Sequence, residues 1–450
     1  MALLLPESEA RLLRGDLLPN ISSPPPGAQS RRIFEELEAW EAPGINTLIE
    51  GQGSLVWQEA LGSNVLDADG NLYIDLTSGF GVAAIGHRHP RVVAAVREQS
   101  GRLLHGLGDV HGHPWRARLA RELCRIVPVD NPQVYFAISG SDAVEITLKT
   151  ALLATGRPGI LAFDPAYHGV TLGSLSATSR PAFRTPFQQH LHGHLHRLPF
   201  AAPPEEIERL LSAEPSIGSL ILEPIAGREG VLLPPDGWLS RVAGICRRRG
   251  VVLIADEIFT GFGRTGHRFA VEREGVRPDL LCCGKALGGG LPVAAAIGRT
   301  ELLSVWSTGE EALHTATFVA NPLASAAALT TLEVLESEEL TSRAAELGQW
   351  LGEALHRALH HLPQVREIRG RGLLWGIELA DATLAKAWSA ASLRHGLVVL
   401  AGGSRGTVLQ VVPPLSITCT QLEAAVELLQ QALAEALQDP ARKASGEPPS

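Results

Sequence analysis

The sequence predicts an α/β fold, with a large domain built on a mostly parallel sheet and a smaller α+β domain toward the C-terminus. Three observations predict it. From about residue 115 onward, helical periods alternate with short apolar runs, as in strands joined by helices. These runs are apolar throughout, which indicates a sheet covered on both faces. After Asn321-Pro322 the pattern changes to a long helical stretch followed by further strand-like segments.

The N-terminal part is less regular. Residues 17–30 are rich in Pro, Ser and Gly and predict an irregular arm, because Pro and Gly interrupt helices and strands alike. A short helix is expected over 31–41 (RRIFEELEAWE). Residues 55–76 are expected to form two strands joined by a turn at Asp69-Gly70.

The central part supplies the strands of the predicted large sheet. A helix is expected over WRARLARELCRIV, then a strand at 133–139 and a helix over 141–156 that ends at Gly156. Five more short apolar runs predict strands: GILAF (159–163), SLILEP (219–224), VVLIAD (251–256), LLCCG (280–284) and VAAAIG (293–298). Helix-like segments such as PEEIERLLSAEP and WLSRVAGICRRRG separate several of them, so neighbouring strands are expected to run parallel.

The C-terminal part predicts helices and a few strands. Helical periodicity continues from residue 322 to about 361. The segments 366–380 (REIRGRGLLWGIELA) and 407–417 (TVLQVVPPLSI) predict strands. A last helix is expected to open with the capping-box pattern Thr420-x-x-Glu423 and to end near Leu437.

These patterns divide the chain into four parts. They are an N-terminal arm and helix at 1–55 that pack on the small domain, a large cofactor-binding domain at 56–325, a small domain at 326–440 and a disordered tail at 441–450. The tail is polar and rich in Pro, Ser and charged residues, which explains the expectation of disorder.

Composition excludes several classes of protein. The 450 residues are 45% hydrophobic, enough for two domains, and the formal net charge of -9 without a basic cluster argues against nucleic-acid partners. No uncharged apolar run approaches about 18 residues, so no membrane span is expected. The N-terminus is a poor secretory signal, because Glu7 and Glu9 follow its short apolar start. The cysteines form neither a disulfide framework nor a zinc spacing, so a cytoplasmic location is expected; they are Cys124, Cys246, Cys282, Cys283 and Cys419.

The stretch GVVLIADEIFTGFGRTG (250–266) contains GFGRTG, which matches the G-x-G-x-x-G pattern of dinucleotide-binding turns. Such a turn follows its strand directly, whereas here several residues separate Asp256, at the strand end, from the glycines. Asp256 and Glu257 would also repel a pyrophosphate. The pattern therefore predicts a turn, and the two acidic residues become the candidates for chemistry.

Lysine usage points to one residue. Lys and Arg total 39, yet the lysines are only Lys149, Lys285, Lys386 and Lys443. A lysine amine can be neutral and can form an imine, which an arginine cannot do. Lys285 lies in a glycine-rich loop, CCGKALGGGLP, just after a predicted strand.

Two further features are expected at the same sheet edge, because ligands of open α/β sheets bind at the carboxyl ends of strands. Asp256 ends one strand, and Gly140 and Ser141 open a helix whose free N–H groups can bind phosphate. An imine-forming lysine, a carboxylate that keeps a ring nitrogen protonated and a phosphate-binding helix start are the attachments that pyridoxal phosphate needs.

At this point the sequence resembles the class III, or ω-type, aminotransferases of pyridoxal-phosphate fold type I. The resemblance covers about residues 45–435 and rests on motifs in the family's order: LDADGNLYIDLTSGFGVAAIGHRHP, SGSDAVE, AYHG, LEPIAG, LIADEIFTGFGRTG, GKALGGGLP and TFVANP. It implies a mostly parallel seven-stranded sheet between helices. It also implies transfer of an amino group from an amine or an ω- or α-amino acid to a keto acid or aldehyde.

The resemblance assigns cofactor contacts residue by residue. Lys285 would form the Schiff base with the cofactor and shuttle a proton, and Asp256 would pair with the pyridinium nitrogen. Gly140 and Ser141 would hold the phosphate. A surface lysine, a turn residue and a plain helix cap are the simpler roles for these positions.

Other roles concern the two ring faces, the subunit boundary and the substrate. Tyr167 would stack on one face of the ring and Ile258 would press on the other, although isolated Tyr and Ile residues are more often core residues. Thr317 would reach the phosphate from the neighbouring subunit, which implies a homodimer with shared active sites. Glu223 would line the substrate side.

The sequence departs from the family pattern in three places. Phe259 stands where the family often has Gln, and Val319 and Ala320 replace glycines near the subunit boundary. Gln410 stands where many members bind a substrate carboxylate with Arg. A neutral amide cannot make the bidentate charged pair that Arg makes, so the carboxylate-bearing substrates of the family are in doubt. Three alternatives stay open: Arg371 or Arg405 compensates, the substrate carries no carboxylate at this place, or the chemistry differs.

Two alternatives stay open. The tract HLHGHLHRL places His190, His192, His194 and His196 at alternate positions, which suits metal binding, but no Cys or acidic pair completes a site. A solvated or substrate-entrance loop is the preferred interpretation, and no metal is expected. An amino-acid racemase or epimerase on the same fold would use the same Lys285, and a non-enzymatic relative would have little need of Lys285 and Asp256.

Overall fold

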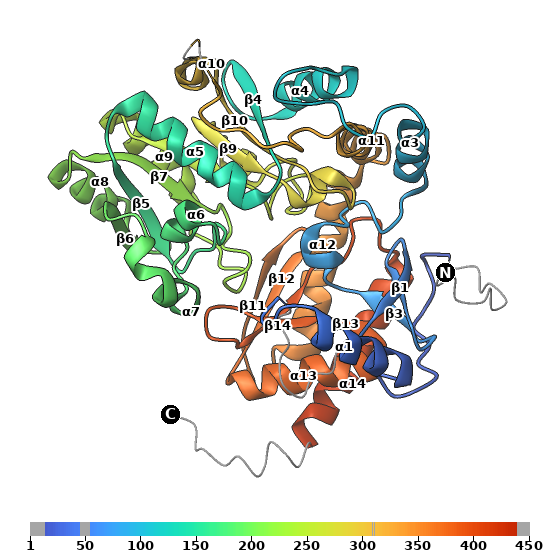
Figure 1. Ribbon diagram of the computed structural model, residues 1–450. Helices are drawn as coiled ribbons and strands as arrows, with labels where there is room; N and C mark the ends of the chain where they lie inside the picture. The colour runs from blue at the N-terminus through green and yellow to red at the C-terminus, as the bar shows by residue number, and fades with distance from the viewer. Residues whose placement is uncertain (1–13, 46–54, 308, 310, 439–450) are drawn as a thin grey trace.

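The computed structural model describes residues 14–45, 55–307, 309 and 311–438, and its largest element is a seven-stranded sheet (Figure 1). The strand order is β4-β10-β9-β8-β7-β5-β6. The strands are β4 (Pro132–Ala137), β5 (Gly159–Asp164), β6 (Leu195–Pro199), β7 (Ile217–Leu222), β8 (Val252–Asp256), β9 (Leu280–Cys283) and β10 (Ala294–Arg299). From β9 to β6 all neighbours are parallel, whereas β10 runs antiparallel to β4 and β9. The predicted mostly parallel seven-stranded sheet is confirmed.

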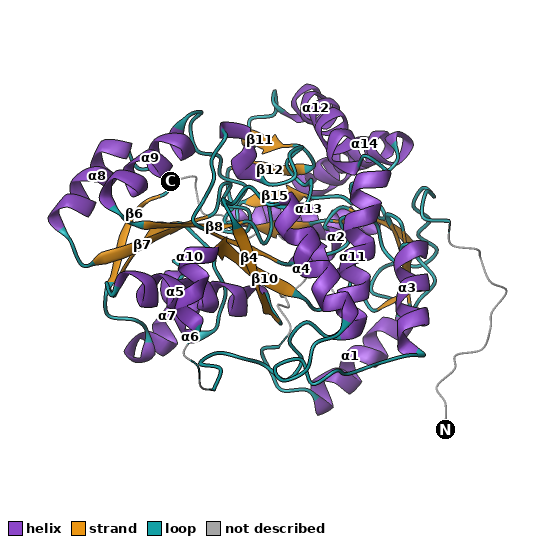
Figure 2. Ribbon diagram, turned by 90° about the horizontal axis from the view of Figure 1, so that it is seen from above, coloured by secondary structure: helices purple, strands orange, loops and turns teal. Residues whose placement is uncertain are grey.

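Helices cover both faces of this sheet (Figure 2). In that view α8 (Pro204–Ala213) and α9 (Trp238–Arg249) lie above the strands, and α5 (Gly140–Thr155) lies below them. Every residue of β7 and β8 is buried as a result, which explains why these strands are apolar throughout. The other helices of this part are α2 (Ser78–Gly81), α3 (Pro90–Ser100), α4 (Pro114–Ile126), α6 (Leu172–Ala177), α7 (Pro181–Arg184), α10 (Thr300–Leu303) and α11 (Pro322–Ser337), with 3-10 turns η1 (Thr185–His190), η2 (Ala270–Glu274), η3 (Lys285–Gly288) and η4 (Ser304–Trp306).

The C-terminal part forms a second layer, seen in the lower half of Figure 1. Its antiparallel sheet has the order β11-β12-β15-β14. These strands are β11 (Val365–Arg371), β12 (Leu374–Leu379), β14 (Leu400–Gly402) and β15 (Val408–Val411), and the helices are α12 (Leu340–Leu359), α13 (Ala382–Arg394) and α14 (Cys419–Gln438). Helix α13 and the strand β14 were not predicted, because short mixed segments carry little periodicity.

The N-terminal strands join the C-terminal part. The order of the third sheet is β1-β2-β3-β13, with β1 (Trp57–Leu61), β2 (Asn64–Asp67), β3 (Leu72–Asp75) and β13 (Leu397–Val398). The segment 57–75 therefore shares a sheet with the C-terminal part rather than with the large sheet. The arm lies on the same side, where Gln421 donates to the carbonyl oxygens of Gly15 and Leu17. The helix expected over 31–41 is α1 (Ala28–Trp40). The division of the chain into domains stays a prediction, and the tail at 441–450 lies outside the described residues.

Two details of the predicted helices are wrong. The helical stretch after residue 322 is two helices, α11 and α12, because Glu339 between them takes a left-handed backbone with φ of 49°. The capping box of α14 is formed by Thr418 and Gln421 instead of Thr420 and Glu423. The Thr418 hydroxyl accepts from the Gln421 N–H at 3.1 Å, and the Gln421 amide oxygen accepts from the Thr418 N–H at 3.3 Å. The same pattern occurs twice within a few residues, and only the packed helix shows which one caps it.

The GFGRTG segment is a turn that connects the parts of the chain. Arg264 is 1% exposed, and its guanidinium donates to the carbonyl oxygens of Leu373 at 3.0 Å and Pro413 at 2.5 Å and to the Ser78 hydroxyl at 3.2 Å. Charged donors that saturate buried carbonyl groups fix the position of a turn. The expectation of a turn rather than a dinucleotide site is consistent with this structural use. Among the described residues no helix has the length and apolarity that crossing a membrane requires.

Candidate active site

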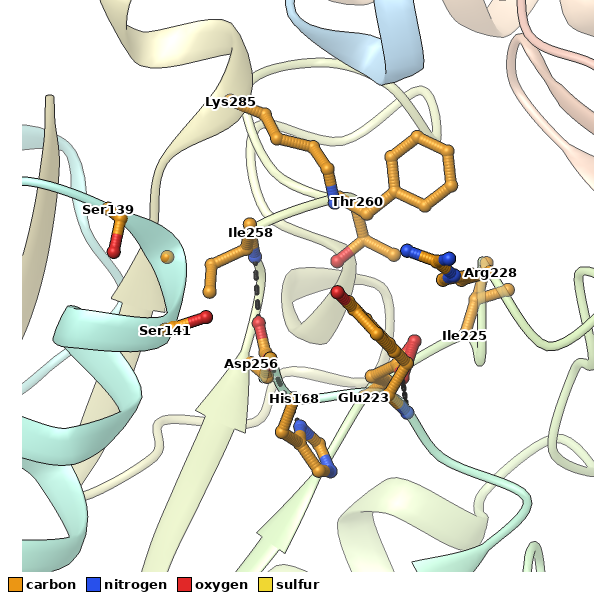
Figure 3. Close-up of a pocket in the computed structure, with 14 residues that line it drawn as sticks. Ser139, Ser141, His168, Glu223, Ile225, Arg228, Asp256, Ile258, Thr260 and Lys285 are labelled. Atoms are coloured by element: carbon orange, nitrogen blue, oxygen red, sulfur yellow. Dashed lines mark hydrogen bonds and ion pairs between the residues drawn. The ribbon is translucent and has the colours of Figure 1, made fainter. Parts of the chain in front are cut away.

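The carboxyl ends of β4, β7, β8 and β9 surround a cavity of about 210 Å³. Figure 3 shows its lining side chains directed toward a common space. The lining residues are Ser139, Gly140, Ser141, Tyr167, His168, Gly169, Glu223, Ile225, Arg228, Asp256, Ile258, Phe259, Thr260 and Lys285. The structure thus brings together seven of the nine site residues predicted from the sequence.

Lys285 follows β9 and begins the 3-10 turn η3. Its backbone φ is +38°, an unusual value for a residue with a side chain, and such strain is common at functional positions. Burial lowers the pKa of the Lys285 amine, and the negative charges of Asp256 and Glu223 oppose this effect. The amine lies 4.4 Å from the ring centre of Phe259. A lysine in this environment loses its proton more readily than a surface lysine, as a nucleophilic amine requires.

Asp256 ends β8 and is held by two hydrogen bonds. Its Oδ2 lies 2.8 Å from Nδ1 of His168, and its Oδ1 accepts from the Ile258 N–H at 3.1 Å. Asp256 is 4% exposed and His168 is 2% exposed. A buried carboxylate with this support can pair with a protonated ring nitrogen without moving.

The N-terminus of α5 forms another wall. The Ser139 hydroxyl accepts from the Asp142 N–H at 3.2 Å and caps the helix, while Gly140 and Ser141 lie in its first turn. A Cβ added to Gly140 would lie 2.9 Å from Cδ1 of Ile258, so a larger residue here would require the Ile258 side chain to shift. Free N–H groups and the helix dipole make this end suitable for a phosphate.

Glu223 follows β7 and holds two loops of the cavity. Its Oε1 accepts from the Tyr167 N–H at 2.8 Å and its Oε2 accepts from the Gly227 N–H at 2.9 Å. Burial raises the pKa of Glu223 to about 7, with the negative charge of Asp256 adding to the rise and His168 opposing it. Tyr167 therefore lies on a loop whose position depends on a carboxyl group that titrates near neutrality.

Replacing Glu223 with Gln should flatten the pH dependence of stability. Because its pKa is raised from 4.5 to about 7, Glu223 contributes stability that is complete below pH 4.5 and is lost as the pH rises through about 7. The loss is at most about 3 kcal/mol in the free energy of unfolding. Urea unfolding at a series of pH values measures it. We expect Glu223→Gln to be less stable at low pH, since its amide cannot accept both N–H bonds, but to lose less stability on going to pH 8.

The control for this series is Glu353→Gln on the outside of α12, which should keep the wild-type slope. Burial also raises the pKa of Glu257 to about 7. Every variant will therefore keep the part of the pH dependence of stability that comes from Glu257. Parallel stability curves for wild type and Glu223→Gln would contradict the raised pKa.

Three residues expected at the site lie elsewhere. Thr317 is exposed and does not line the cavity of its own chain. Gln410 lies in β15 outside the cavity, and its amide nitrogen donates to the carbonyl oxygen of Gly227 at 2.8 Å. Glu257, proposed together with Asp256 as a chemical group, is fully buried and holds the turn instead: it accepts from the Thr260 hydroxyl and from the Val271 N–H. Successive residues after a strand point to opposite sides, so only Asp256 reaches the cavity.

Neither arginine expected to compensate for Gln410 reaches the cavity. Arg371 pairs with Asp236 at 2.9 Å, and Arg405 pairs with Glu378 at 2.5 Å. Arg371, at the end of β11, is directed to a surface carboxylate, and Arg405, in the loop between β14 and β15, is directed to a half-buried one.

Sequence reasoning missed His168 and Arg228. His168 stands beside Tyr167 in AYHG, and Arg228 follows LEPIAG, so both lay next to motifs that had been noticed. The signal that could have indicated both residues is that each is a polar residue in or directly after a motif that follows a predicted strand. Phe259 had been noted only as a departure. The Phe259 ring fits because Gly81 and Gly227 flank it. A Cβ on Gly81 would lie 2.6 Å from a ring atom, and a Cβ on Gly227 would lie 2.3 Å from one.

The histidine tract does not form a metal site. His190 ends η1, His192 lies 2.9 Å from the carbonyl oxygen of Pro158, and His196 lies in the edge strand β6. The preferred loop interpretation is therefore wrong for residues 195–198, which pair with β5. In the part of the chain that the structure describes, no cluster of three His, Cys, Asp or Glu side chains is placed to hold a metal ion.

The donor set fits pyridoxal phosphate. A cavity amine with a lowered pKa, a buried carboxylate and a helix N-terminus lie around one space, and they match the aldehyde, the ring nitrogen and the phosphate of that cofactor. Tyr167 and Ile258 both line the same space, where a ring would lie.

Comparison with known proteins gives a consistent result. A sequence profile described as class III aminotransferase matches residues 49–433. The chain is 38% identical over 387 residues to an acetylornithine aminotransferase of Methanopyrus kandleri, covering 86% of this chain and 94% of that protein. A structure of the ornithine aminotransferase of Toxoplasma gondii, described with partial occupancy of PLP at its active site, aligns with a TM-score of 0.84 at 29% identity and covers 92% and 96% of the two chains. An (S)-enantioselective ω-transaminase of Thermomicrobium roseum aligns with a TM-score of 0.83 at 28% identity over 91% and 99%.

Proposed function

The chain belongs to the class III aminotransferases, which are pyridoxal-phosphate-dependent transferases, and on this premise we propose that Lys285 carries the transfer of an amino group from an amine or amino acid to a keto acid or aldehyde. One observation supports this assignment above the others. Lys285, Asp256 and the N-terminus of α5 come from three separate elements and line one cavity.

The residues that would hold the cofactor follow from their positions. Gly140 and Ser141 would bind its phosphate, Asp256 its ring nitrogen and Lys285 its aldehyde, with Tyr167 and Ile258 against the ring. When bound, pyridoxal phosphate supplies an aldehyde that receives the amino group and a ring that accepts the electrons left on the substrate carbon.

Lys285 acts as the group that moves a proton. Burial lowers the pKa of its amine and so favours the neutral form, whose Nζ can accept a proton from the substrate carbon and return it during the same half-reaction. The amino donor leaves as an oxo compound, and a second oxo compound then takes the amino group in the reverse order. No oxidant is consumed over the two halves.

Asp256 and Glu223 fix the surroundings of that proton transfer. Asp256 would pair with the ring nitrogen of the bound cofactor, and His168 is a positioning residue that holds the Asp256 carboxylate. Glu223 fixes the Tyr167 and Gly227 backbones on the substrate side. Fixed groups of this kind need no reorganisation when charge develops.

A homodimer with shared active sites is part of the proposal. The segments 103–110 and 313–318 lie together, because the Asn321 amide donates to the Leu104 carbonyl oxygen and the His105 and Phe318 rings are 5.6 Å apart. They expose large apolar side chains: Leu103, Leu104, Leu107, Val110, Leu313 and Phe318. An apolar surface beside the exposed Thr317 supports Thr317 reaching the cavity of a second copy. The cytoplasmic location expected from the cysteine pattern stays a prediction.

The visible absorbance of the purified protein tests the proposal. Reconstitution with pyridoxal phosphate should give the band of a lysine-linked cofactor, and a substrate amine should discharge it without any keto acid. The same sample should sediment as a dimer. Failure to take up the cofactor would exclude the proposed function. If the band persists while an amino acid loses its optical rotation, the protein is a racemase instead.

A further inference from the structure

Arg228 is a cation of the cavity that the proposed chemistry does not use. It follows Gly227 on the loop after β7, and within the described residues Arg228 and Lys285 are the arginine and lysine side chains that line the cavity. Figure 3 shows both entering the cavity from different elements, with their terminal nitrogens directed toward the same space.

The guanidinium of Arg228 lies against two aromatic rings. Its Cζ lies 4.3 Å from the ring centre of Tyr167 and 5.3 Å from that of Phe183. A cation–π contact of this kind does not use the N–H donors of the guanidinium in hydrogen bonds to oxygen. Over residues 14–45, 55–307 and 311–438, its nitrogens make no ion pair and no hydrogen bond.

The neighbouring arginines are committed to carboxylates. Arg180 pairs with buried Glu229 at 3.0 Å, Arg371 pairs with exposed Asp236 at 2.9 Å, and Arg405 pairs with half-buried Glu378 at 2.5 Å. A half-buried guanidinium without such a partner, at the wall of a cavity, is suited to a ligand anion.

Gln410 has a place in this arrangement. Its amide nitrogen donates to the carbonyl oxygens of Gly227 at 2.8 Å and Arg228 at 3.4 Å. The position at which the family resemblance places a carboxylate-binding arginine is therefore occupied by a side chain that holds the backbone of Arg228. Compared with the family pattern, the positive charge is absent from β15 and present on the loop after β7. The Gln410 side chain on β15 holds that loop.

We propose that Arg228 binds the carboxylate of the substrate, and that Gln410 is the residue that positions it. The inference rests on the proposed function and narrows its substrates to amino acids and oxo acids that carry a carboxylate. Plain amines lack the group that Arg228 recognises.

Matched pairs of amino donors test the proposal in the holoenzyme. Alanine, 4-aminobutyrate and 5-aminovalerate differ from ethylamine, propylamine and butylamine only by the carboxylate. The test uses the pair whose acid discharges the visible band fastest. At low donor concentration, we expect wild type to be discharged faster by this acid than by its plain amine. Arg228→Gln should reduce the rate with the acid about 10- to 100-fold more than it reduces the rate with the plain amine. Arg228→Lys should show an intermediate loss, because a single ammonium cannot bind a carboxylate through two donors.

Binding without turnover gives a second measurement. Propionate, butyrate and valerate added to the holoenzyme should perturb the visible band and protect it from discharge, and Arg228→Gln should weaken this binding by a similar factor. Gln410→Ala should raise KM for the acid more than it lowers kcat, without changing KM for the plain amine. Arg405→Gln, exposed and paired with Glu378, is the matched control and should behave as wild type.

The outcomes separate the two proposals. Equal loss with acids and plain amines in Arg228→Gln would give Arg228 a structural role and overturn this inference, while the band would still support the proposed function. No preference for acids in wild type would overturn it as well. A wild-type protein without cofactor uptake would instead remove the proposed function on which it rests.

Discussion

Replacing Lys285 with Ala should reduce amino-group transfer at least about 10³-fold, because the variant loses the group that moves the proton and cannot bond the cofactor aldehyde. The visible band of the lysine-linked cofactor should also be absent. Steady-state rates and the absorbance spectrum of the reconstituted variant measure both effects. Alanine keeps the β-carbon of lysine and therefore leaves the backbone strain at position 285 unchanged, so the variant should fold as well as wild type.

Lys386→Ala is the matched control, since Lys386 is exposed on α13 in the C-terminal part. It should keep the wild-type spectrum and rate. Small amines added to Lys285→Ala should restore part of the activity by entering the vacated space and moving the proton in its place. Transfer within tenfold of wild type in Lys285→Ala would assign the chemistry to another group.

Asp256→Asn should lower kcat about 10²- to 10³-fold, because an uncharged amide cannot keep the ring nitrogen of the cofactor protonated. The replacement has the same shape, so the loss reports charge rather than packing. The variant should still bind the cofactor through Lys285 and show the visible band, which separates this effect from that of Lys285→Ala.

Two further variants serve as comparisons for Asp256→Asn. His168→Leu should lose less activity than Asp256→Asn, because His168 acts by holding the carboxylate at 2.8 Å. Asp236→Asn, a surface carboxylate paired with Arg273 and Arg371, should leave the rate unchanged. If Asp256→Asn and Asp236→Asn behave alike, Asp256 has no role in the chemistry.

Much of the large sheet could be predicted from local pattern. The runs that became β5, β7, β8 and β9 are apolar because both faces of the sheet are covered, and that burial leaves a direct trace in the sequence. The edge strand β6 left no such trace, since it contains His196 and Arg197 and none of its residues is fully buried. The strand β13 is too short for periodicity and is a strand only because β3 lies beside it.

The sequence alone determined the chemistry that we propose for this protein, because each proposed attachment for the cofactor is a residue type at the end of a predictable element: Lys285 after β9, Asp256 at the end of β8 and Gly140 at the start of α5. Tertiary structure decided what surrounds them. His168 reaches Asp256 across 88 positions of sequence, and Gln410 reaches Gly227 across 183. Contacts between segments so far apart depend on how the layers pack, and no local pattern encodes them. The same packing turns Arg371 and Arg405 to the surface and leaves Arg228 in the cavity.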